Sequence, residues 1–79
     1  LKCMIGSMPE LGVGTAAQIH LGTAMPNLDL ASDCCGTLYH EHHFLQTSLE
    51  IAGGYAYPSH APGLGVELDE HVVAQYRIA

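Results

Sequence analysis

The chain has 79 residues, of which 48% are apolar and 13% are charged, whereas about a quarter of an average soluble domain is charged. Because a small domain has a large surface for its volume, so low a charged fraction indicates material cut from a larger core, or one layer of an assembly. The net charge of −6, with Lys2 and Arg77 as the two basic residues, excludes a phosphate-binding patch for nucleic acid and attraction to an anionic membrane surface.

The amino-terminal residues predict a buried strand that runs into a loop. Residues 2–6 form a short apolar run, which is typical of a strand inside a sheet. Pro9, Gly12 and Gly14 follow, and we expect them to keep this stretch out of a helix because both residue types disfavour helix interiors. The run before Pro9 is too short for a signal peptide, and no stretch of the chain approaches the roughly 20 apolar residues of a membrane span.

A helix is expected next. Thr15 and Gln18 have the spacing of a capping box, which predicts a helix over about residues 16–25. We expect Pro26 and Asn27 to end it, because both are common just beyond helix termini. The helix carries no charged residue, so it should be covered on most of its sides.

The middle of the chain predicts a β-hairpin after a less regular stretch. We expect residues 28–39 to be irregular, with room for a short strand, and residues 40–45 to form one helical turn. Residues 49–57 predict the hairpin, because apolar residues alternate on both sides of Gly53-Gly54, which fits a two-residue loop.

The carboxyl-terminal residues predict a loop, a short strand and a last helix. Proline and glycine make residues 58–65 a loop, and residues 66–68 read as a short strand. Asp69 is then expected to cap a helix that reaches Tyr76, because aspartate is among the preferred helix caps.

Glu10 lies between the predicted strand and the predicted helix, on a glycine-rich loop. Side chains at the carboxyl ends of strands form the sites of α/β folds, and the N-terminus of a following helix favours anions. An anionic substrate group could rest there, with Glu10 beside it as an acid or a hydrogen-bond partner. The alternative, which the spacing alone favours, is a solvated loop carboxylate.

The most conspicuous polar cluster is His40, Glu41, His42 and His43. His40 and His43 could share a helical face, and His60 or Cys34 could complete a metal site with them. The pattern is not HExxH, so the zinc-protease arrangement is excluded. The alternative is an exposed, histidine-rich turn that binds no metal.

The chain has three cysteines, Cys3, Cys34 and Cys35, without a CxxC spacing. Neighbouring cysteines rarely bridge each other, so we expect reduced thiols in a cytoplasmic protein. The Cys34-Cys35 pair could supply a nucleophile, but Asp33 next to it would raise a thiol pKa. That charge favours the other interpretation, in which the two side chains are small buried hydrophobes.

Four motifs occur in a fixed order: MIGSMPELGVGTAA, an Asp33-x-x-Gly36 element, LEIAGGY, and PGLGVELDE. Together they resemble the C-terminal end of the enolase superfamily, in the muconate lactonizing enzyme (muconate cycloisomerase) subgroup of the mandelate racemase/muconate lactonizing enzyme family. The resemblance covers about residues 3–76, and the first and last motifs are specific as a pair.

The resemblance implies an α/β fold, the (β/α)7β modified TIM barrel with a separate α+β capping domain. Residues 1–48 would be the end of the barrel domain, with its last strand, its last helix and an irregular connection. Residues 49–79 would be the tail, hairpin included, that returns to the capping domain. No complete domain is then expected in this chain, which would explain its uncovered apolar faces.

The resemblance also implies proton transfer next to a substrate carboxylate, in a cycloisomerase, a racemase or epimerase, or a dehydratase. Mg2+ or Mn2+ would stabilise the enediolate. Glu10 matches the last-strand glutamate that contacts the substrate or intermediate, so it is the expected catalytic residue, with Ser7 and Met8 as substrate-binding residues. The metal ligands and the acid/base lysines would lie on strands outside this chain.

The expected partners are therefore the remainder of the barrel and capping domain, or a companion chain, together with a small carboxylate substrate, in a homo-oligomer. A second hypothesis is a non-catalytic remnant that self-associates or binds a partner through its apolar surface. A third is a metal-binding protein built on His40, His42 and His43.

Overall fold

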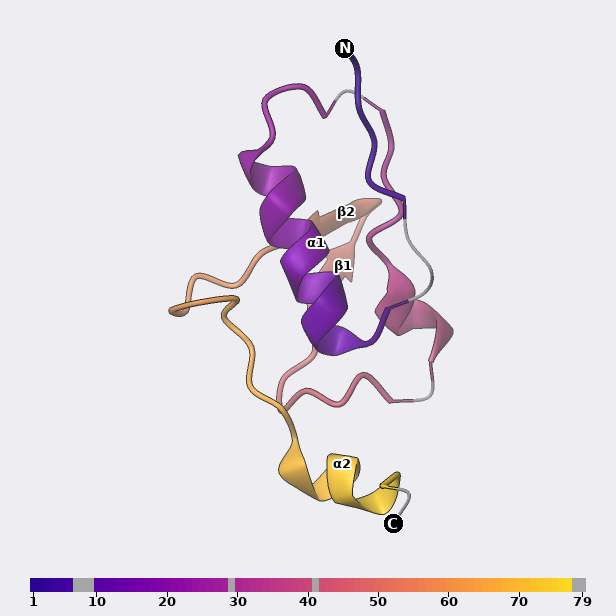
Figure 1. The fold of residues 1–79 in the computed structure, drawn as a ribbon, viewed down its shortest axis with the longest axis vertical. Coiled ribbons are helices and arrows are strands. Elements are labelled where there is room, and N and C mark those ends of the chain that lie inside the picture. Colours follow the sequence, from indigo (N-terminus) through magenta and orange to yellow (C-terminus); the bar gives the residue numbers. More distant parts are fainter. Residues whose placement is uncertain (7–9, 29, 41, 78–79) are drawn as a thin grey trace.

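The computed structural model describes residues 1–6, 10–28, 30–40 and 42–77. Its elements, in chain order, are helix α1 (Gly12–Ala24), the 3-10 helix η1 (Gly36–Tyr39), strands β1 (Glu50–Ala52) and β2 (Tyr55–Tyr57), and helix α2 (Glu70–Gln75). Figure 1 shows α1 along the long axis of the molecule, with the hairpin behind it and α2 beyond its first turn. The chain is an α/β fragment rather than a closed layer structure.

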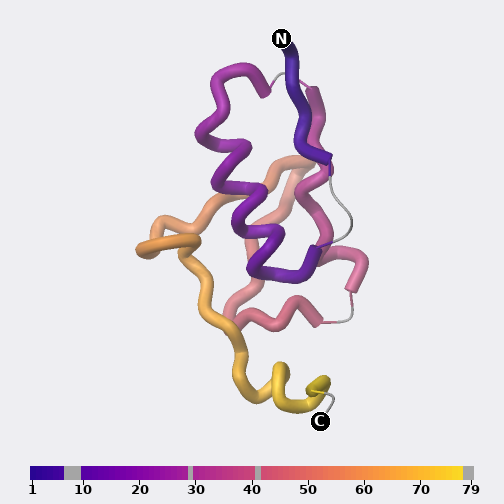
Figure 2. The backbone as a smooth tube through the Cα atoms, in the orientation of Figure 1, coloured from indigo at the N-terminus to yellow at the C-terminus, as the bar shows by residue number. Residues whose placement is uncertain are grey.

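The predicted strand at residues 2–6 is extended but does not form a regular ladder. It runs beside residues 30–33 (Figure 2), and Cys3 N–H donates to the Asn27 carbonyl at 2.9 Å. Ile5 interrupts the pattern, because its N–H donates to the Ser32 hydroxyl and not to a backbone carbonyl. The strand prediction is therefore wrong for the described residues, although the side chain of Ile5 is buried as expected.

Helix α1 begins at Gly12, four residues before the predicted start, so the capping-box prediction is wrong. Leu11 is the N-cap and makes no side-chain capping bond. Thr15 lies inside the helix, where it is fully buried and its hydroxyl donates to the Glu10 carbonyl at 3.2 Å. The predicted end is confirmed, since the helix stops at Ala24.

Close packing explains why the glycines enter the helix. A Cβ on Gly12 would overlap the Leu45 side chain and the His43 carbonyl, and a Cβ on Gly14 would lie 2.7 Å from the Glu10 carboxylate. Glycine costs about 1 kcal/mol in a helix relative to alanine, but at Gly12 it allows an approach to the His43 carbonyl that a side chain would block. Propensity alone therefore placed the start of the helix too late.

The predicted helical turn at residues 40–45 is not present in the described part of that stretch. Helical geometry occurs earlier, in η1, and Leu45 instead forms an isolated antiparallel bridge with Leu68. Asp69 N–H donates to the Phe44 carbonyl at 2.8 Å, and Phe44 itself has a φ of 66°. The bridge at Leu68 is what remains of the short strand expected at residues 66–68.

The hairpin prediction is confirmed. Strands β1 and β2 pair antiparallel, with Glu50 opposite Tyr57 and Ala52 opposite Tyr55. Gly53 and Gly54 connect them with φ values of 60° and 82°. Two consecutive left-handed residues are what a type I′ turn requires, so glycine is the fitting residue at both positions.

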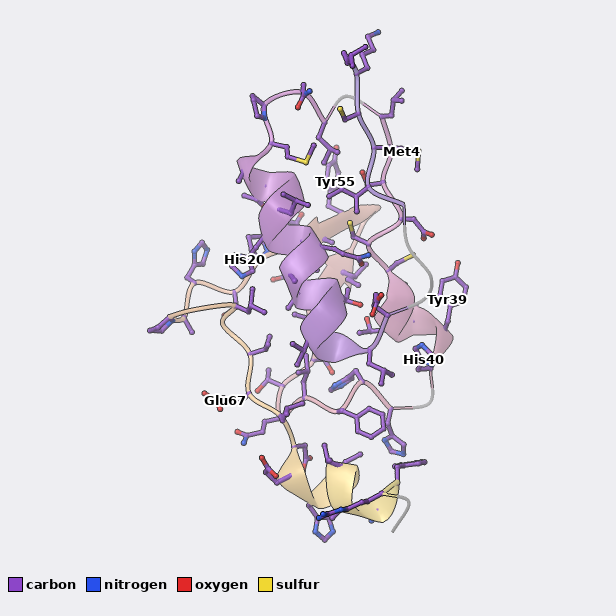
Figure 3. All side chains as sticks on the ribbon, viewed as in Figure 1. Met4, His20, Tyr39, His40, Tyr55 and Glu67 are labelled. Atoms are coloured by element: carbon purple, nitrogen blue, oxygen red, sulfur yellow. The ribbon has the colours of Figure 1, made fainter. Side chains whose placement is uncertain are left out.

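The cap of α2 is also confirmed. The Asp69 carboxylate accepts hydrogen bonds from the N–H groups of His71 at 3.1 Å and Val72 at 3.3 Å. No residue of α2 is buried. Figure 3 shows Glu67 just before this helix. It also shows His20 on the side of α1 that faces the loop of residues 58–65, where His20 Nε2 lies 2.8 Å from the Leu64 carbonyl.

The core of the described residues is very small. The buried apolar side chains are Ile5, Ala16, Ile19 and Leu45. The large apolar side chains that stay exposed include Leu1, Met4, Leu11, Leu21, Leu30, Leu38, Tyr39, Tyr55, Leu68 and Tyr76. The accessible surface is 5722 Å², against about 4600 Å² for a compact monomer of this mass. The excess in accessible surface indicates that part of the apolar surface would be covered by other protein in a complete domain.

The shape leads to the same conclusion. The radius of gyration is 13.2 Å, against about 11.6 Å for a compact domain of this length, and the molecule extends over 45 × 25 × 24 Å.

Among the described residues, no helix is long and apolar enough to cross a membrane.

The Asp69 cap yields a direct test. We expect Asp69→Ala to weaken the first turn of α2 by about 1 kcal/mol, because two N–H groups lose their acceptor. Amide exchange at His71 and Val72 should then be about fivefold faster, measured by NMR. Glu67→Ala, which removes an exposed carboxylate two residues earlier, should leave both rates unchanged. Equal rates in Asp69→Ala and the parent chain would contradict the assignment of the cap.

Candidate functional site

Glu10 is held at the start of α1 by its backbone. The Thr15 hydroxyl donates to its carbonyl, and Thr15 N–H donates to the Leu11 carbonyl at 2.9 Å. On the other side, Gly36 of η1 lies so close that a Cβ there would overlap the Glu10 backbone nitrogen and oxygen. The sequence did not identify Thr15 and Gly36 as positioning residues, because Thr15 matched a cap and Gly36 was visible only as part of a motif.

The Glu10 side chain bends back over the first turn of α1. Its Oε2 lies 2.7 Å from the position that a Cβ of Gly14 would take, although the side chain as a whole is exposed. The N-terminus of a helix carries a partial positive charge, which favours a carboxylate or another anion there. Gly12 N–H already donates to the His43 carbonyl at 3.0 Å, so the amides left for an anion lie further along the turn. Ser7 and Met8, the expected substrate-binding residues, lie outside the described residues.

An open groove of about 1000 Å³ runs beside Glu10. The first turn of α1 forms one wall, with Glu10 and Val13, and the end of α2 forms another, with Tyr76 and Arg77. Most of the remaining lining is apolar. The groove therefore places one carboxylate and one of the two basic residues of the chain on the same mostly apolar surface, and Arg77 is a member that sequence reasoning did not single out.

The histidines of the conspicuous cluster make different contacts, although His40 and His43 both line the groove beside Glu10. His42 packs against Tyr76 with ring centroids 5.4 Å apart. Leu45 N–H donates to His43 Nδ1 at 3.0 Å, and His43 Nε2 lies 2.9 Å from the Ser48 hydroxyl, so both nitrogens of that ring are engaged. His40 is exposed beside Tyr39 at the edge of the molecule (Figure 3).

These positions do not support the metal site that the sequence left open. Across the residues that the structure describes, no three His, Cys, Asp or Glu side chains converge on one point. His60 and Cys34, the suggested additional ligands, line different cavities. Glu41 lies outside the described residues.

Cys34 and Cys35 are half-buried free thiols, as is Cys3. Burial raises the pKa of the Cys34 thiol, and the negative charges of Asp33 and of a Cys35 thiolate raise it further. The Cys35 thiol donates to the Asp33 carboxylate at 3.5 Å. A raised pKa lowers the thiolate fraction at neutral pH, so Cys34 is poorly suited to act as a nucleophile, in agreement with the direction expected from Asp33.

Comparison with known proteins identifies the family. A family model described as enolase C-terminal domain-like matches residues 1–72. The chain belongs to this family. Muconate cycloisomerase 1 of Rhodococcus opacus is 38% identical over 73 residues, which are 92% of this chain and 20% of that protein. A D-galactonate dehydratase family member of Streptomyces bingchenggensis is 34% identical over 64 residues, covering 81% of this chain and 15% of its own length.

A solved structure agrees with the sequence comparison. The crystal structure of muconate lactonizing enzyme from Klebsiella pneumoniae matches the whole chain with a TM-score of 0.92 and 32% identity. The chain covers 22% of that protein, and it spans about a fifth or less of the curated relatives. The resemblance seen in the sequence motifs is therefore confirmed, both for the enolase superfamily and for its muconate lactonizing enzyme subgroup.

The contact between Gly36 and Glu10 can be tested by adding one methyl group. We expect Gly36→Ala to lower the free energy of unfolding by about 1–3 kcal/mol, because the new Cβ overlaps the Glu10 backbone and must displace it. Gly6→Ala is the matched control, since no atom lies within 4 Å of the Cβ that it adds. Urea unfolding of both variants measures the difference, and equal midpoints would contradict the contact.

The pKa of Cys34 leads to a second test in this region. We expect Asp33→Asn to remove one cause of the raised pKa, so that the thiol ionises at lower pH. The rate of iodoacetamide alkylation at Cys34, followed by peptide mass spectrometry, should then begin to rise at a lower pH in the variant than in the parent chain. Alkylation of Cys3 in the same samples is the internal control. An unchanged or upward-shifted profile at Cys34 would show that the Asp33 charge does not act on it.

Proposed function

We propose that this chain is the carboxyl-terminal portion of a metal-dependent isomerase or lyase that transfers a proton at the carbon next to a substrate carboxylate. The reaction would be a cycloisomerisation, a racemisation or epimerisation, or a dehydration. Relatives named for a cycloisomerase and for a dehydratase family support this class. The single observation that carries the proposal is the position of Glu10, which is fixed at the N-terminus of α1 in a member of this family.

The division of the chain follows from the same proposal. Residues 1–48 would close the barrel domain with its last strand, last helix and an irregular connection, and residues 49–79 would return to the capping domain. The exposed apolar side chains on residues 1–6 and on α1 support it, because barrel neighbours would cover them. The remainder of the barrel and cap, or a companion chain, is then the required partner.

Glu10 would contact the substrate or the intermediate as an acid or a hydrogen-bond partner. Its backbone is restrained by Thr15 and Gly36, so the carboxyl is held in place while its side chain stays accessible in this chain. The partial positive charge of the first turn of α1 would favour a substrate anion beside it. Ser7 and Met8 precede it and would line the same pocket, which the rest of the protein would close.

The divalent metal of this proposal, Mg2+ or Mn2+, does not fit the described residues, because no three candidate ligands converge there. Its ligands and the acid/base lysines would come from the rest of the protein. Lys2 is the single lysine of the chain and is exposed near its amino-terminal end. The part proposed for this chain is therefore limited to contact with the substrate.

The experiment replaces the corresponding carboxyl-terminal segment of Rhodococcus opacus muconate cycloisomerase 1 with this chain. We expect the chimera to fold and to convert muconate, and Glu10→Gln in it to lower kcat/KM about a hundredfold, because the side chain can no longer act as an acid. Glu67→Gln, an exposed carboxylate outside the groove, is the matched control and should keep full activity. Full activity in Glu10→Gln would contradict the assigned role.

A second candidate function rests on the excess of exposed apolar surface, which also suits a self-associating, non-catalytic module. This hypothesis expects the chain by itself to unfold cooperatively at a temperature that rises with its concentration, because association stabilises the folded state. The enzyme-portion proposal instead expects stabilisation by the complementary part of the cycloisomerase. Thermal unfolding of the chain with and without that part distinguishes the two.

A further inference from the structure

Cys34 and Cys35 lie in the wall of a second cavity, separate from the groove beside Glu10. This cavity has a volume of about 450 Å³ and lies between residues 32–38 and the hairpin. Both cysteines line it, whereas the neighbouring cavity that extends along α1 is lined by Cys34 without Cys35. Two adjacent cysteines thus line one partly open cavity.

The state of these thiols limits what they can do. Burial and the negative charge of Asp33 raise the pKa of the Cys34 thiol, and the Cys35 thiol donates a hydrogen bond to the Asp33 carboxylate. Alkylation and disulfide exchange begin with a thiolate, so both are disfavoured at Cys34. A direct bridge between the two is disfavoured as well, since neighbouring cysteines must strain the backbone to bring their sulfurs to a bond length of about 2 Å.

A reagent that binds both sulfurs together, and releases their protons as part of the reaction, needs neither a preformed thiolate nor a direct sulfur–sulfur bond. A trivalent arsenical with one carbon substituent has two valences left for sulfur and so needs no further protein ligand. A zinc ion would need about four ligands, whereas the described residues do not bring even three together. Soft thiol ligands also suit a soft centre such as arsenic(III).

We propose that Cys34 and Cys35 form a dithiol site for trivalent arsenicals that carry one apolar substituent. With phenylarsine oxide, each sulfur forms a bond to arsenic, the arsenic–oxygen bond breaks, and the two thiol protons leave with the oxygen as one water molecule. Arsenic remains trivalent and no oxidant or reductant takes part. The arsenic atom spans the two sulfurs, so they do not have to approach to the distance of a disulfide.

The cavity accounts for the preference for an apolar substituent. Besides the cysteines, its lining includes Leu38 of η1, Ile51 of β1 and Ala56 of β2. These side chains form apolar walls next to the sulfurs, and burial of a phenyl ring against them would be favourable by the hydrophobic effect. The site would thus depend on the folded hairpin as well as on the two cysteines.

The test is titration of the chain with phenylarsine oxide, followed by intact-mass spectrometry and by the heat of binding. We expect one phenylarsenic group per chain, with the loss of two hydrogen atoms, and displacement by ethanedithiol but not by a monothiol. A linear peptide with the sequence of residues 31–38 carries the same cysteine pair without the hairpin. The folded chain should bind about tenfold more tightly than this peptide, which corresponds to about 1.4 kcal/mol.

Variants separate the parts of the proposal. Cys34→Ser and Cys35→Ser should each abolish the two-hydrogen adduct, whereas Cys3→Ser, the matched control, should keep it. Ile51→Ala should reduce the affinity towards that of the peptide and leave the stoichiometry unchanged. An adduct that persists in Cys34→Ser would place the site elsewhere, and equal affinities for the chain and the peptide would overturn the contribution of the cavity. Neither result bears on the catalytic proposal for Glu10.

Discussion

The rest of this structure depends on the close backbone packing around the first turn of α1. Gly12 allows the helix to approach the Leu45 side chain and the His43 carbonyl, while Gly36 allows η1 to approach the backbone of Glu10. From Leu45 the connection continues through the bridge to Leu68 and on to the Asp69 cap of α2. With so small a core, these close backbone contacts replace much of the side-chain packing that orders a larger domain.

Local chemistry was predicted well from the sequence where a few neighbouring residues decide the structure. The turn at Gly53-Gly54 and the Asp69 cap are of this kind, since each depends on the conformation or hydrogen bonding of two to four residues. The start of α1 was predicted wrongly because it depends on residues far along the chain. No local rule indicates that Gly12 will lie against Leu45. The capping-box spacing of Thr15 and Gln18 is also a local pattern, so it gave a helix start that this distant contact overrides.

The candidate site shows the same limit. Glu10 was visible in the sequence because of its place before a helix and within a recognisable motif. Its supports were not, since Gly36 reaches it across 26 positions of the chain and Arg77 joins the groove from the far end. The expected strand at residues 2–6 failed for a physical reason as well. Among the described residues, this segment makes backbone hydrogen bonds with Asn27, Leu30 and Asp33, whereas the Ile5 N–H donates to a side-chain hydroxyl in place of a backbone carbonyl.

The hairpin has a consequence for handling the chain apart from any larger protein. In the described residues β1 and β2 pair with each other alone, so each strand keeps one outer edge of backbone groups without a sheet neighbour. The tyrosines of β2, Tyr55 and Tyr57, are exposed beside that edge. Such an edge is a template on which another copy can add a strand. Aggregation by sheet extension is therefore the failure expected of a preparation at high concentration, and a lysine introduced on β2 is the kind of change that natural sheets use against it.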